Sequence, residues 1–199
     1  MIKKIININK SEPYKKFISK YEAAINANQK NVEAFVISSF DKKNQEVDSR
    51  FVNLKYIIDD EWVFFSNYDS PKSQQFLDHD QITSVFYWPN IDTQIRIKSK
   101  IKPSSKEISD THFINRDKEK NALAICSKQS EKVLSHDDFL FKYKHTLETE
   151  DLKKRPEYWG GFSFFPYYFE FWYGHEKRLN KREVYQLNKT DWIKFYIQP

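Results

Sequence analysis

Hydrophobic and polar residues alternate along much of this chain, which is the pattern of half-buried β-strands. Polar segments at 41–45 and 59–61 interrupt the alternation and predict turns, so the first three strands should form an antiparallel meander. The expected strands are 33–40, 50–58, 62–66, 82–88, 93–101, 161–173 with a break at Pro166, and a terminal hairpin of 182–188 and 192–198.

Apolar residues three and four positions apart predict helices in other segments. An N-terminal helix is expected at about 11–28 with Ser11 as its N-cap, and a short helix at 70–79 with Ser70 as its N-cap. A densely charged stretch at about 104–148 predicts a helical insertion. Its three expected pieces are 104–114, 117–126 and 136–148.

Together these elements predict a β-rich α+β protein. Seven or eight antiparallel strands that follow one another along the chain are typical of a closed or split β-barrel, here with peripheral helices. No internal repeat or low-complexity linker divides the chain, so residues 1–199 are interpreted as a single domain.

The composition changes this picture little, but it narrows the class of ligand. Aromatic residues make up 17% of the chain, and aromatic side chains favour strands. The formal net charge of +5 fits an anionic small-molecule ligand. Acidic residues interleave the basic ones, whereas a nucleic-acid-binding protein is expected to gather its basic residues on one face, so nucleic acid is not an expected partner.

Several classes of site and location are excluded or disfavoured. The chain lacks the GxGxxG, GxxxxGK[ST], HExxH and CxxC motifs, and its five histidines show no metal-ligand spacing, so no metal is expected. The single cysteine, Cys126, allows no internal disulfide and is expected to be buried and structural. No apolar run approaches the roughly 18–20 residues of a membrane span. The N-terminus does not resemble a signal peptide, and a cytoplasmic protein without a membrane partner is expected.

Six segments of the chain stand in an order that resembles the pyridoxamine 5′-phosphate oxidase family. Each is a weak motif alone, whereas six in order at fitting spacing are a strong signal. The segments are EPYKKF (12–17), RFVNLK (50–55), FFSN with SPK (64–67 and 70–72), TQIRI (93–97), SKQSE (127–131), and YWGGF with EFWYGHEKRLNKR (158–162 and 170–182).

This resemblance implies an FMN-binding split β-barrel that forms a homodimer, with two FMN molecules in clefts between the subunits. It also implies a reaction. The flavin takes a hydride equivalent from C4′ of pyridoxamine or pyridoxine 5′-phosphate to give pyridoxal 5′-phosphate, and O2 reoxidises the flavin and is released as H2O2. The cofactor carries this chemistry, while the protein supplies position and electrostatics.

The resemblance assigns cofactor-binding residues over much of the chain. The FMN phosphate needs cations and N–H donors, which Arg50, Lys72 and the helix start at Ser70 can supply. Gln94 and Trp172 are expected at the flavin ring. The implied cofactor-binding set is Arg50, Phe51, Val52, Lys55, Phe65, Ser66, Lys72, Gln94, Gln129, Ser130, Trp172 and Arg182.

One pair in this set conflicts with a regular strand. Arg50 and Lys55 are an odd number of residues apart, so a continuous strand would point them to opposite faces. The sequence therefore predicts either a bulge between them or a strand that begins just after Arg50.

The resemblance implies a second phosphate site, for the substrate. Lys55 and Arg116 match its basic positions, and Arg178 matches an arginine that lies against the pyridine ring. Catalytic roles are implied for Arg178 and Asn180. The implied substrate-binding set is Lys55, His112, Arg116, Lys120, Arg178 and Asn180.

Four positions depart from the family pattern: Pro71 replaces an arginine, His112 a tyrosine, Lys120 a serine and Asn180 a histidine. The arginine missing at Pro71 should weaken FMN binding by on the order of 1.5–3 kcal/mol. These departures leave two alternatives open. One is a related FMN oxidase with a different aromatic substrate, as in phenazine biosynthesis. The other is a non-catalytic protein that binds flavin or pyridoxal phosphate.

Overall fold

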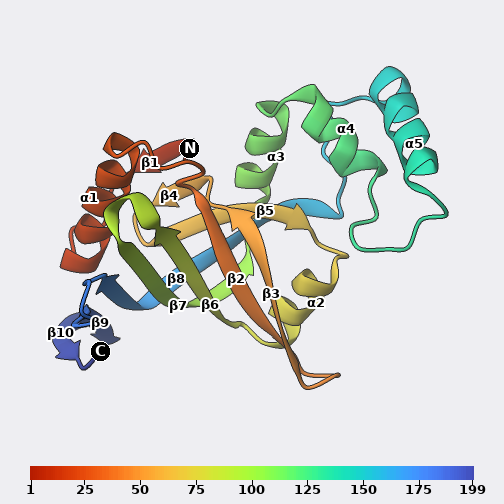
Figure 1. Cartoon of the computed structure of the whole chain (residues 1–199). Helices are drawn as coiled ribbons and strands as arrows, with labels where there is room; N and C mark the ends of the chain where they lie inside the picture. The colour runs from red at the N-terminus through yellow and green to blue at the C-terminus, as the bar shows by residue number, and fades with distance from the viewer.

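The computed structural model describes all 199 residues as one ten-stranded sheet with five α-helices around it. The sheet forms the body of the molecule, and a helical arm extends away from one end of it (Figure 1). None of the helices is both long enough and apolar enough to cross a membrane.

The strands follow the order β1-β4-β5-β8-β7-β6-β2-β3, and β9 joins β8 to β10. All pairs are antiparallel except β1 with β4, so the sheet is mixed. The strand bounds are β1 Lys4–Ile6, β2 Ala34–Asp41, β3 Glu46–Asn53, β4 Tyr56–Ile58, β5 Glu61–Asn67, β6 Gln81–Trp88, β7 Thr93–Pro103, β8 Trp159–Tyr173, β9 Lys181–Asn188 and β10 Asp191–Ile197.

The predicted strand at 50–58 is wrong, because the chain changes partners within it. The Leu54 amide donates to Glu33 O beside β2, while the Lys55 amide donates to Val63 O on β5. Two strands result, β3 paired with β2 and β4 paired with β5, so the expected meander is interrupted. This break also resolves the conflict between Arg50 and Lys55: Arg50 lies inside β3 and Lys55 lies after it, so neither a bulge nor a later strand start is needed.

The helices agree with the predicted positions to within a few residues. The expected cap residues Ser11 and Ser70 stand at the N-caps of α1 and α2, but neither side chain makes a capping hydrogen bond. Instead, the Ser70 hydroxyl donates to Asn67 O. The helix bounds are α1 Glu12–Asn26, α2 Pro71–Asp78, α3 Lys106–Ile114, α4 Lys118–Cys126 and α5 His136–Thr149, with a 3-10 turn η1 at Pro89–Ile91.

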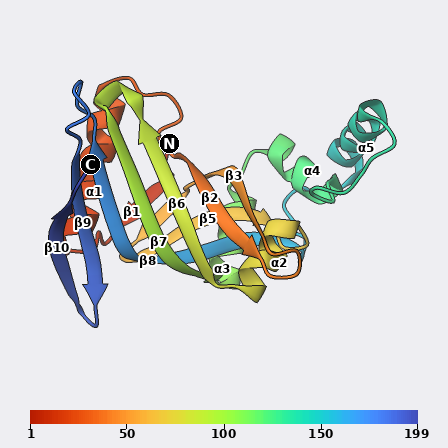
Figure 2. The same ribbon diagram turned by 60° about the horizontal axis from the view of Figure 1, so that its bottom comes forward.

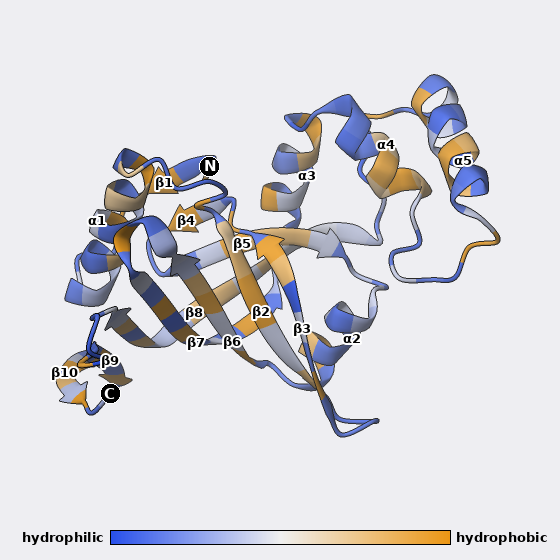
Figure 3. Ribbon diagram, in the orientation of Figure 1, coloured by the Kyte–Doolittle hydropathy of each residue, from blue (hydrophilic) through white to orange (hydrophobic).

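Aromatic side chains from α1 and the sheet fill the core. Phe17 on α1 lies 4.4 Å from the Trp62 ring and 5.1 Å from the Phe86 ring, measured between ring centroids, and all three side chains are fully buried. Hydrophobic positions are prominent on the strands, while the arm carries many polar ones (Figure 3). Burial of such large aromatic surfaces is the main stabilising contribution, and it holds the sheet as a rigid frame.

Strand β8 is 15 residues long and crosses the whole sheet. The predicted break at Pro166 is wrong, because the strand continues through it. Lys98 pairs with Tyr168 and Ser99 pairs with Pro166, so Tyr167 is an extra residue in a β-bulge. A bulge accommodates a proline, which cannot donate a ladder hydrogen bond.

The arm of α3, α4 and α5 is the predicted helical insertion. Figure 2 shows α4 and α5 standing clear of the sheet. Helix α5 buries only Thr146, whereas α3 buries Ser109, His112 and Phe113. The arm is therefore anchored to the body through α3. Cys126, at the end of α4, is buried as expected and forms no disulfide.

The start of β8 requires glycine. A Cβ on Gly160 would overlap the Tyr68 hydroxyl and lie 3.0 Å from Ser109 Oγ on α3. We expect Gly160→Ala to reduce the free energy of unfolding by about 1–3 kcal/mol, as overpacking does. Urea unfolding measures this change. In a Tyr68→Phe background the same substitution should cost less, since the closest of the overlapping atoms is gone and only the ring carbon at 2.7 Å remains; an equal cost in both backgrounds would contradict this explanation.

Candidate functional site

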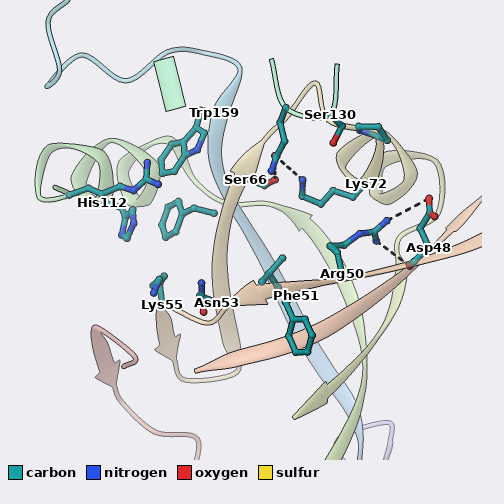
Figure 4. Close-up of a pocket in the computed structure, with 15 residues that line it drawn as sticks. Asp48, Arg50, Phe51, Asn53, Lys55, Ser66, Lys72, His112, Ser130 and Trp159 are labelled. Carbon is teal, nitrogen blue, oxygen red and sulfur yellow. Dashed lines mark hydrogen bonds and ion pairs between the residues drawn. The ribbon is translucent and has the colours of Figure 1, made fainter. Parts of the chain in front are cut away.

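A pocket of about 600 Å³ opens where β3, β5, α2 and α3 approach one another (Figure 4). Four of its lining residues are basic and one is acidic. The lining residues are Asp48, Arg50, Phe51, Val52, Asn53, Lys55, Phe65, Ser66, Pro71, Lys72, His112, Arg116, Gln129, Ser130 and Trp159.

Lys72 is a buried cation without a carboxylate partner. It lies in the first turn of α2, and the residue is only 8% exposed. Its ammonium donates to Ser70 Oγ at 2.9 Å and to Gln129 Oε1 at 2.8 Å, both neutral acceptors. Burial, together with the charge of Arg50, lowers the pKa of Lys72 to about 8. Such a group gains from an anion beside it, because a buried charge is costly until it is paired.

Arg50 lies beside Lys72 on the same side of the pocket (Figure 4). Its Nη1 donates to Ser39 Oγ at 2.6 Å, and its Nη2 lies 3.6 Å from Asp48 Oδ2. Gln75 holds the same carboxylate by donating from Nε2 to Asp48 Oδ2 at 2.7 Å. The arginine is therefore fixed in place. One carboxylate faces two cations here, so positive charge remains in excess.

Lys55 and Arg116 supply positive charge to the pocket from other elements. Lys55 lies between β3 and β4, and its ammonium is 3.9 Å from Glu33 Oε1. Arg116 follows α3, forms no salt bridge, and stacks over Trp159 with its guanidinium carbon 4.7 Å from the ring centroid. Its Nη1 is buried without a hydrogen-bond partner. Burial lowers the pKa of both side chains, which again favours an anion near them.

Three nearly parallel rings form an apolar wall of the pocket. His112 stacks on Phe65 at 3.7 Å between centroids, and Trp159 stacks on Phe65 at 5.4 Å. Burial and the neighbouring cations lower the pKa of His112 to about 3, so its ring is neutral at ordinary pH. A site with flat rings and excess positive charge suits a planar aromatic ligand that carries phosphate.

The structure brings eleven of the predicted site residues into this single pocket. They come from five separate stretches of the chain, yet all of them line it. Phe51 is only partly enclosed, since it is 75% exposed on β3. The residues brought together are Arg50, Phe51, Val52, Lys55, Phe65, Ser66, Lys72, His112, Arg116, Gln129 and Ser130.

Lys120 does not line the pocket. It lies on the exposed side of α4 and pairs with Asp117 at 2.5 Å. The inward orientation that a role in binding requires is not seen. Exposure and a nearby carboxylate on the same helix explain this position, since such (i, i+3) pairs form readily on helix surfaces.

Three more predicted site residues do not line the pocket. They lie side by side elsewhere in the sheet: Gln94, Trp172 and Arg182. Gln94 on β7 pairs with Trp172 on β8, which pairs with Arg182 on β9. Trp172 is 13 residues along β8 from Trp159, or about 40 Å along the strand. Within one chain the two groups therefore stand toward opposite ends of β8, and they share no pocket.

Glu170 fixes the arginine of this distant group. The carboxylate is 2% exposed and accepts from Arg182 Nε at 2.8 Å and from Tyr168 Oη at 3.0 Å, and it also pairs with Arg96. Two guanidiniums on one carboxylate leave a net positive charge on this face of the sheet and lower the pKa of Glu170.

Arg178 and Asn180 lie in the loop between β8 and β9, away from the pocket. Arg178 has a left-handed backbone with φ of 57°. The Asn180 side chain accepts a hydrogen bond from the His175 amide at 3.0 Å, which closes the loop. In this chain Asn180 thus has a local structural role. Both residues lie at the end of the sheet that carries Arg182, not at the pocket that contains Lys72.

Sequence reasoning missed Asp48, Asn53 and Trp159 as lining residues. Trp159 stands in the YWGGF segment that carried part of the resemblance, so the segment was noticed but its tryptophan was not assigned. Asn53 stands in the RFVNLK segment, which was likewise noticed without this residue being assigned, whereas Asp48 stands two residues before that segment and no motif marks it. No group of three or more His, Cys, Asp or Glu side chains is placed to hold a metal ion.

The pocket should bind a phosphate-bearing ligand less well as Lys72 loses its proton. Because its pKa in the free protein is about 8, positive charge is lost as the pH rises through that value. We expect the dissociation constant for FMN to rise up to roughly tenfold per pH unit above about pH 8. Calorimetric titrations between about pH 7 and about pH 9.5 measure this. Lys72→Arg keeps its charge over this range, so its profile should be flat; a profile like that of the wild type would contradict the assignment.

Comparisons with known proteins agree with this picture. The family model described as "Pyridoxine 5'-phosphate oxidase C-terminal dimerisation region" matches residues 159–199. A pyridoxine/pyridoxamine 5′-phosphate oxidase of Hydrogenovibrio crunogenus is 34% identical over 183 residues, which cover 91% of this chain and 84% of that protein. The enzyme of the same name from Legionella pneumophila strain Paris is 33% identical, covering 86% of this chain and 81% of the other.

Two solved structures share the fold. PhzG from Burkholderia lata 383, in complex with tetrahydrophenazine-1-carboxylic acid, aligns with a TM-score of 0.89 at 22% identity and covers 95% of this chain and 93% of the other. A pyridoxamine 5′-phosphate oxidase-related, FMN-binding protein from Nostoc punctiforme PCC 73102 aligns with a TM-score of 0.78 at 12% identity, covering 96% and 99%. At these identities the likeness concerns the fold alone.

Proposed function

This chain belongs to the pyridoxine/pyridoxamine 5′-phosphate oxidase family, and from that premise we propose that it is an FMN-dependent oxidase of phosphorylated B6 vitamers. It would convert pyridoxamine or pyridoxine 5′-phosphate to pyridoxal 5′-phosphate, with O2 as acceptor and H2O2 as second product. The single observation that carries the proposal is the buried Lys72, which has Arg50 at its side and no carboxylate partner in an aromatic-walled pocket.

The residues present fit FMN. Its phosphate carries roughly −1.5 to −2 charges near neutral pH. The side chains of Lys72 and Arg50 and the backbone N–H of Lys72, at the start of α2, offer matching donors. Pro71 takes the first helical position, where a missing N–H costs little. The buried Nη1 of Arg116, which has no partner, fits a second anion in the same pocket.

The bound flavin would supply the hydride-accepting and O2-reducing chemistry. The residues of this chain would position the reactants. Lys72 and Arg50 would hold the cofactor phosphate, while Lys55 and Arg116 would hold the phosphate of the vitamer. Phe65 and Trp159 would exclude water from the apolar wall. The pairing of β5 with β8 holds Phe65 and Trp159 in place without reorganisation, which favours reaction from a fixed geometry.

We further propose a homodimer in which each site takes residues from both subunits. The chain would then form the split barrel typical of the family. The family region that matches residues 159–199 is described as a dimerisation region, and it includes Trp172, Arg178, Asn180 and Arg182. Trp172 lies about 40 Å along β8 from Trp159, and the pocket of this chain contains none of the four residues, so we infer that they complete the pocket of a second copy.

The test of function is direct. Protein purified with FMN should be yellow, and pyridoxine 5′-phosphate added without oxygen should bleach the flavin absorption. Admitting air should restore the colour and release one H2O2 per aldehyde formed. An FMN-loaded protein that neither phosphorylated vitamer reduces would refute the oxidase assignment while leaving FMN binding intact.

The same experiment addresses a second candidate, an FMN oxidase of a different aromatic substrate. His112 and Asn180 favour it, because both differ from the residues expected at the substrate. Flavin reduction by a reduced tricyclic aromatic acid, without reduction by either phosphorylated vitamer, would establish this alternative. A protein that binds FMN and is reduced by neither class would instead be a carrier.

Substitution of Lys72 tests FMN binding separately from catalysis. We expect Lys72→Met to weaken FMN binding by about tenfold to a hundredfold, since a charge-assisted hydrogen bond contributes about 1.5–3 kcal/mol. Saturating FMN should restore most of the turnover. Quenching of flavin fluorescence on titration measures the affinity. Lys98→Met serves as the control: Lys98 lies on β7 outside the pocket, so its loss should leave the affinity unchanged.

A further inference from the structure

Tyr56 does not line the pocket, but it contacts His112, which does. It lies on β4, and its hydroxyl is 2.7 Å from Nδ1 of His112. The Tyr56 ring meets the His112 ring edge-on, at 5.4 Å and an interplanar angle of 88°. Phe65 stacks on the face of the same imidazole at 3.7 Å between ring centroids. The imidazole is therefore held by two aromatic rings, and one of its nitrogens is hydrogen-bonded to Tyr56.

The second nitrogen of His112, Nε2, has no hydrogen-bond partner within the chain, although His112 is only 3% exposed and lines the pocket. Lys3, Lys55 and Arg116 surround the ring with positive charge. They lower its pKa together with burial, so the ring carries a single proton at ordinary pH. A neutral imidazole donates from one nitrogen and accepts at the other, and the partner of the first fixes the role of the second.

Two proton arrangements fit the 2.7 Å contact. Tyr56 donates to Nδ1 and leaves an N–H at Nε2, or it accepts from Nδ1 and leaves a lone pair there. Only the first adds a donor for an oxyanion that Lys55 and Arg116 already attract. Burial raises the pKa of Tyr56, so the hydroxyl keeps its proton and is able to donate.

We propose that Tyr56 is a positioning residue that fixes His112 as an Nε2–H donor to the phosphate of the substrate. This rests on the proposed function, because it names a determinant of that same site. His112 would thereby select a phosphate monoester by hydrogen bonding without adding charge. Lys55 and Arg116 would provide the charge.

The first test is spectroscopic and needs no activity. Nitrogen-15 NMR of the FMN-loaded protein should show a proton on Nε2 of His112 and none on Nδ1. Titration with inorganic phosphate should shift the Nε2 resonance, and Tyr56→Phe should weaken phosphate binding by roughly fivefold. A proton on Nδ1 in the wild type, or a phosphate titration that leaves Nε2 unmoved, would overturn the proposal whether or not the protein oxidises B6 vitamers.

The second test uses kinetics and a matched control. Tyr56→Phe should raise the KM for pyridoxine 5′-phosphate by roughly fivefold with kcat within about twofold of the wild type. Tyr158→Phe removes a hydroxyl that donates to Ile125 O at 2.6 Å outside the pocket, and it should leave KM unchanged. Equal effects of the two substitutions would indicate a general loss of stability and overturn the proposal.

A double-mutant cycle tests whether Tyr56 acts through His112. In a His112→Phe background, Tyr56→Phe should have no further effect on KM, because its action passes through His112. A further increase of the same size would show that Tyr56 acts independently. If the wild-type protein binds FMN and no vitamer reduces this flavin, the oxidase proposal fails. The phosphate titration then still decides whether Tyr56 orients His112.

Discussion

The length of β8 is the constraint on which the site depends. One end of this strand carries Trp159, which forms a wall of the basic pocket, and the other carries Trp172, beside Gln94 and Arg182. A paired strand is stiff, so the two ends cannot fold toward each other within one chain. Residues that the family pattern unites are therefore held apart here. In the proposed homodimer a single subunit would offer one half of each of two sites, and symmetry about a two-fold axis would unite them.

Charge gives the pocket its selectivity. Lys72 and Arg116 are enclosed without carboxylate partners, and Lys55 has only a distant one, in Glu33. Glu183, on β9, shows the contrast: it is equally enclosed, but Lys16 and Lys194 pair with it and lower its pKa to about 2. The Glu183 cluster is satisfied and joins α1 to the C-terminal hairpin. The cations of the pocket lack such partners, and the phosphate of the proposed ligand would supply the missing negative charge.

Much of the fold could be predicted from the sequence, and so could eleven of the fifteen residues that line the pocket. Helices and hairpins followed from local periodicity, which depends on neighbours along the chain. The break between β3 and β4 did not, because it arises when Leu54 and Lys55 bond to different strands. The bulge at Tyr167 and the added strand β1 likewise depend on partners distant in sequence.

The site residues also divide into those that a local sequence motif predicts and those that only distant contacts in the fold reveal. Arg50 and Lys72 stand in recognisable segments, and the resemblance located them. Asp48 and Tyr56 stand in no motif, and their importance follows from where β3 and β4 place them against Gln75 and His112. The resemblance also grouped Arg182 with Lys72 without indicating that they belong to opposite ends of the sheet. That separation is a property of the folded sheet, which no linear pattern records.

Subunit complementation tests the shared site most directly. At an FMN concentration that saturates the wild type but not Lys72→Met, the variants Lys72→Met and Arg182→Gln should each leave both sites of their own homodimer inactive. When the two variants are mixed and allowed to exchange subunits, half of the dimers should be mixed, and each mixed dimer should hold one intact site. The account predicts recovery of about a quarter of the wild-type oxidase activity. If exchange is verified and no activity returns, Lys72 and Arg182 do not serve one site across the dimer, and the account is wrong.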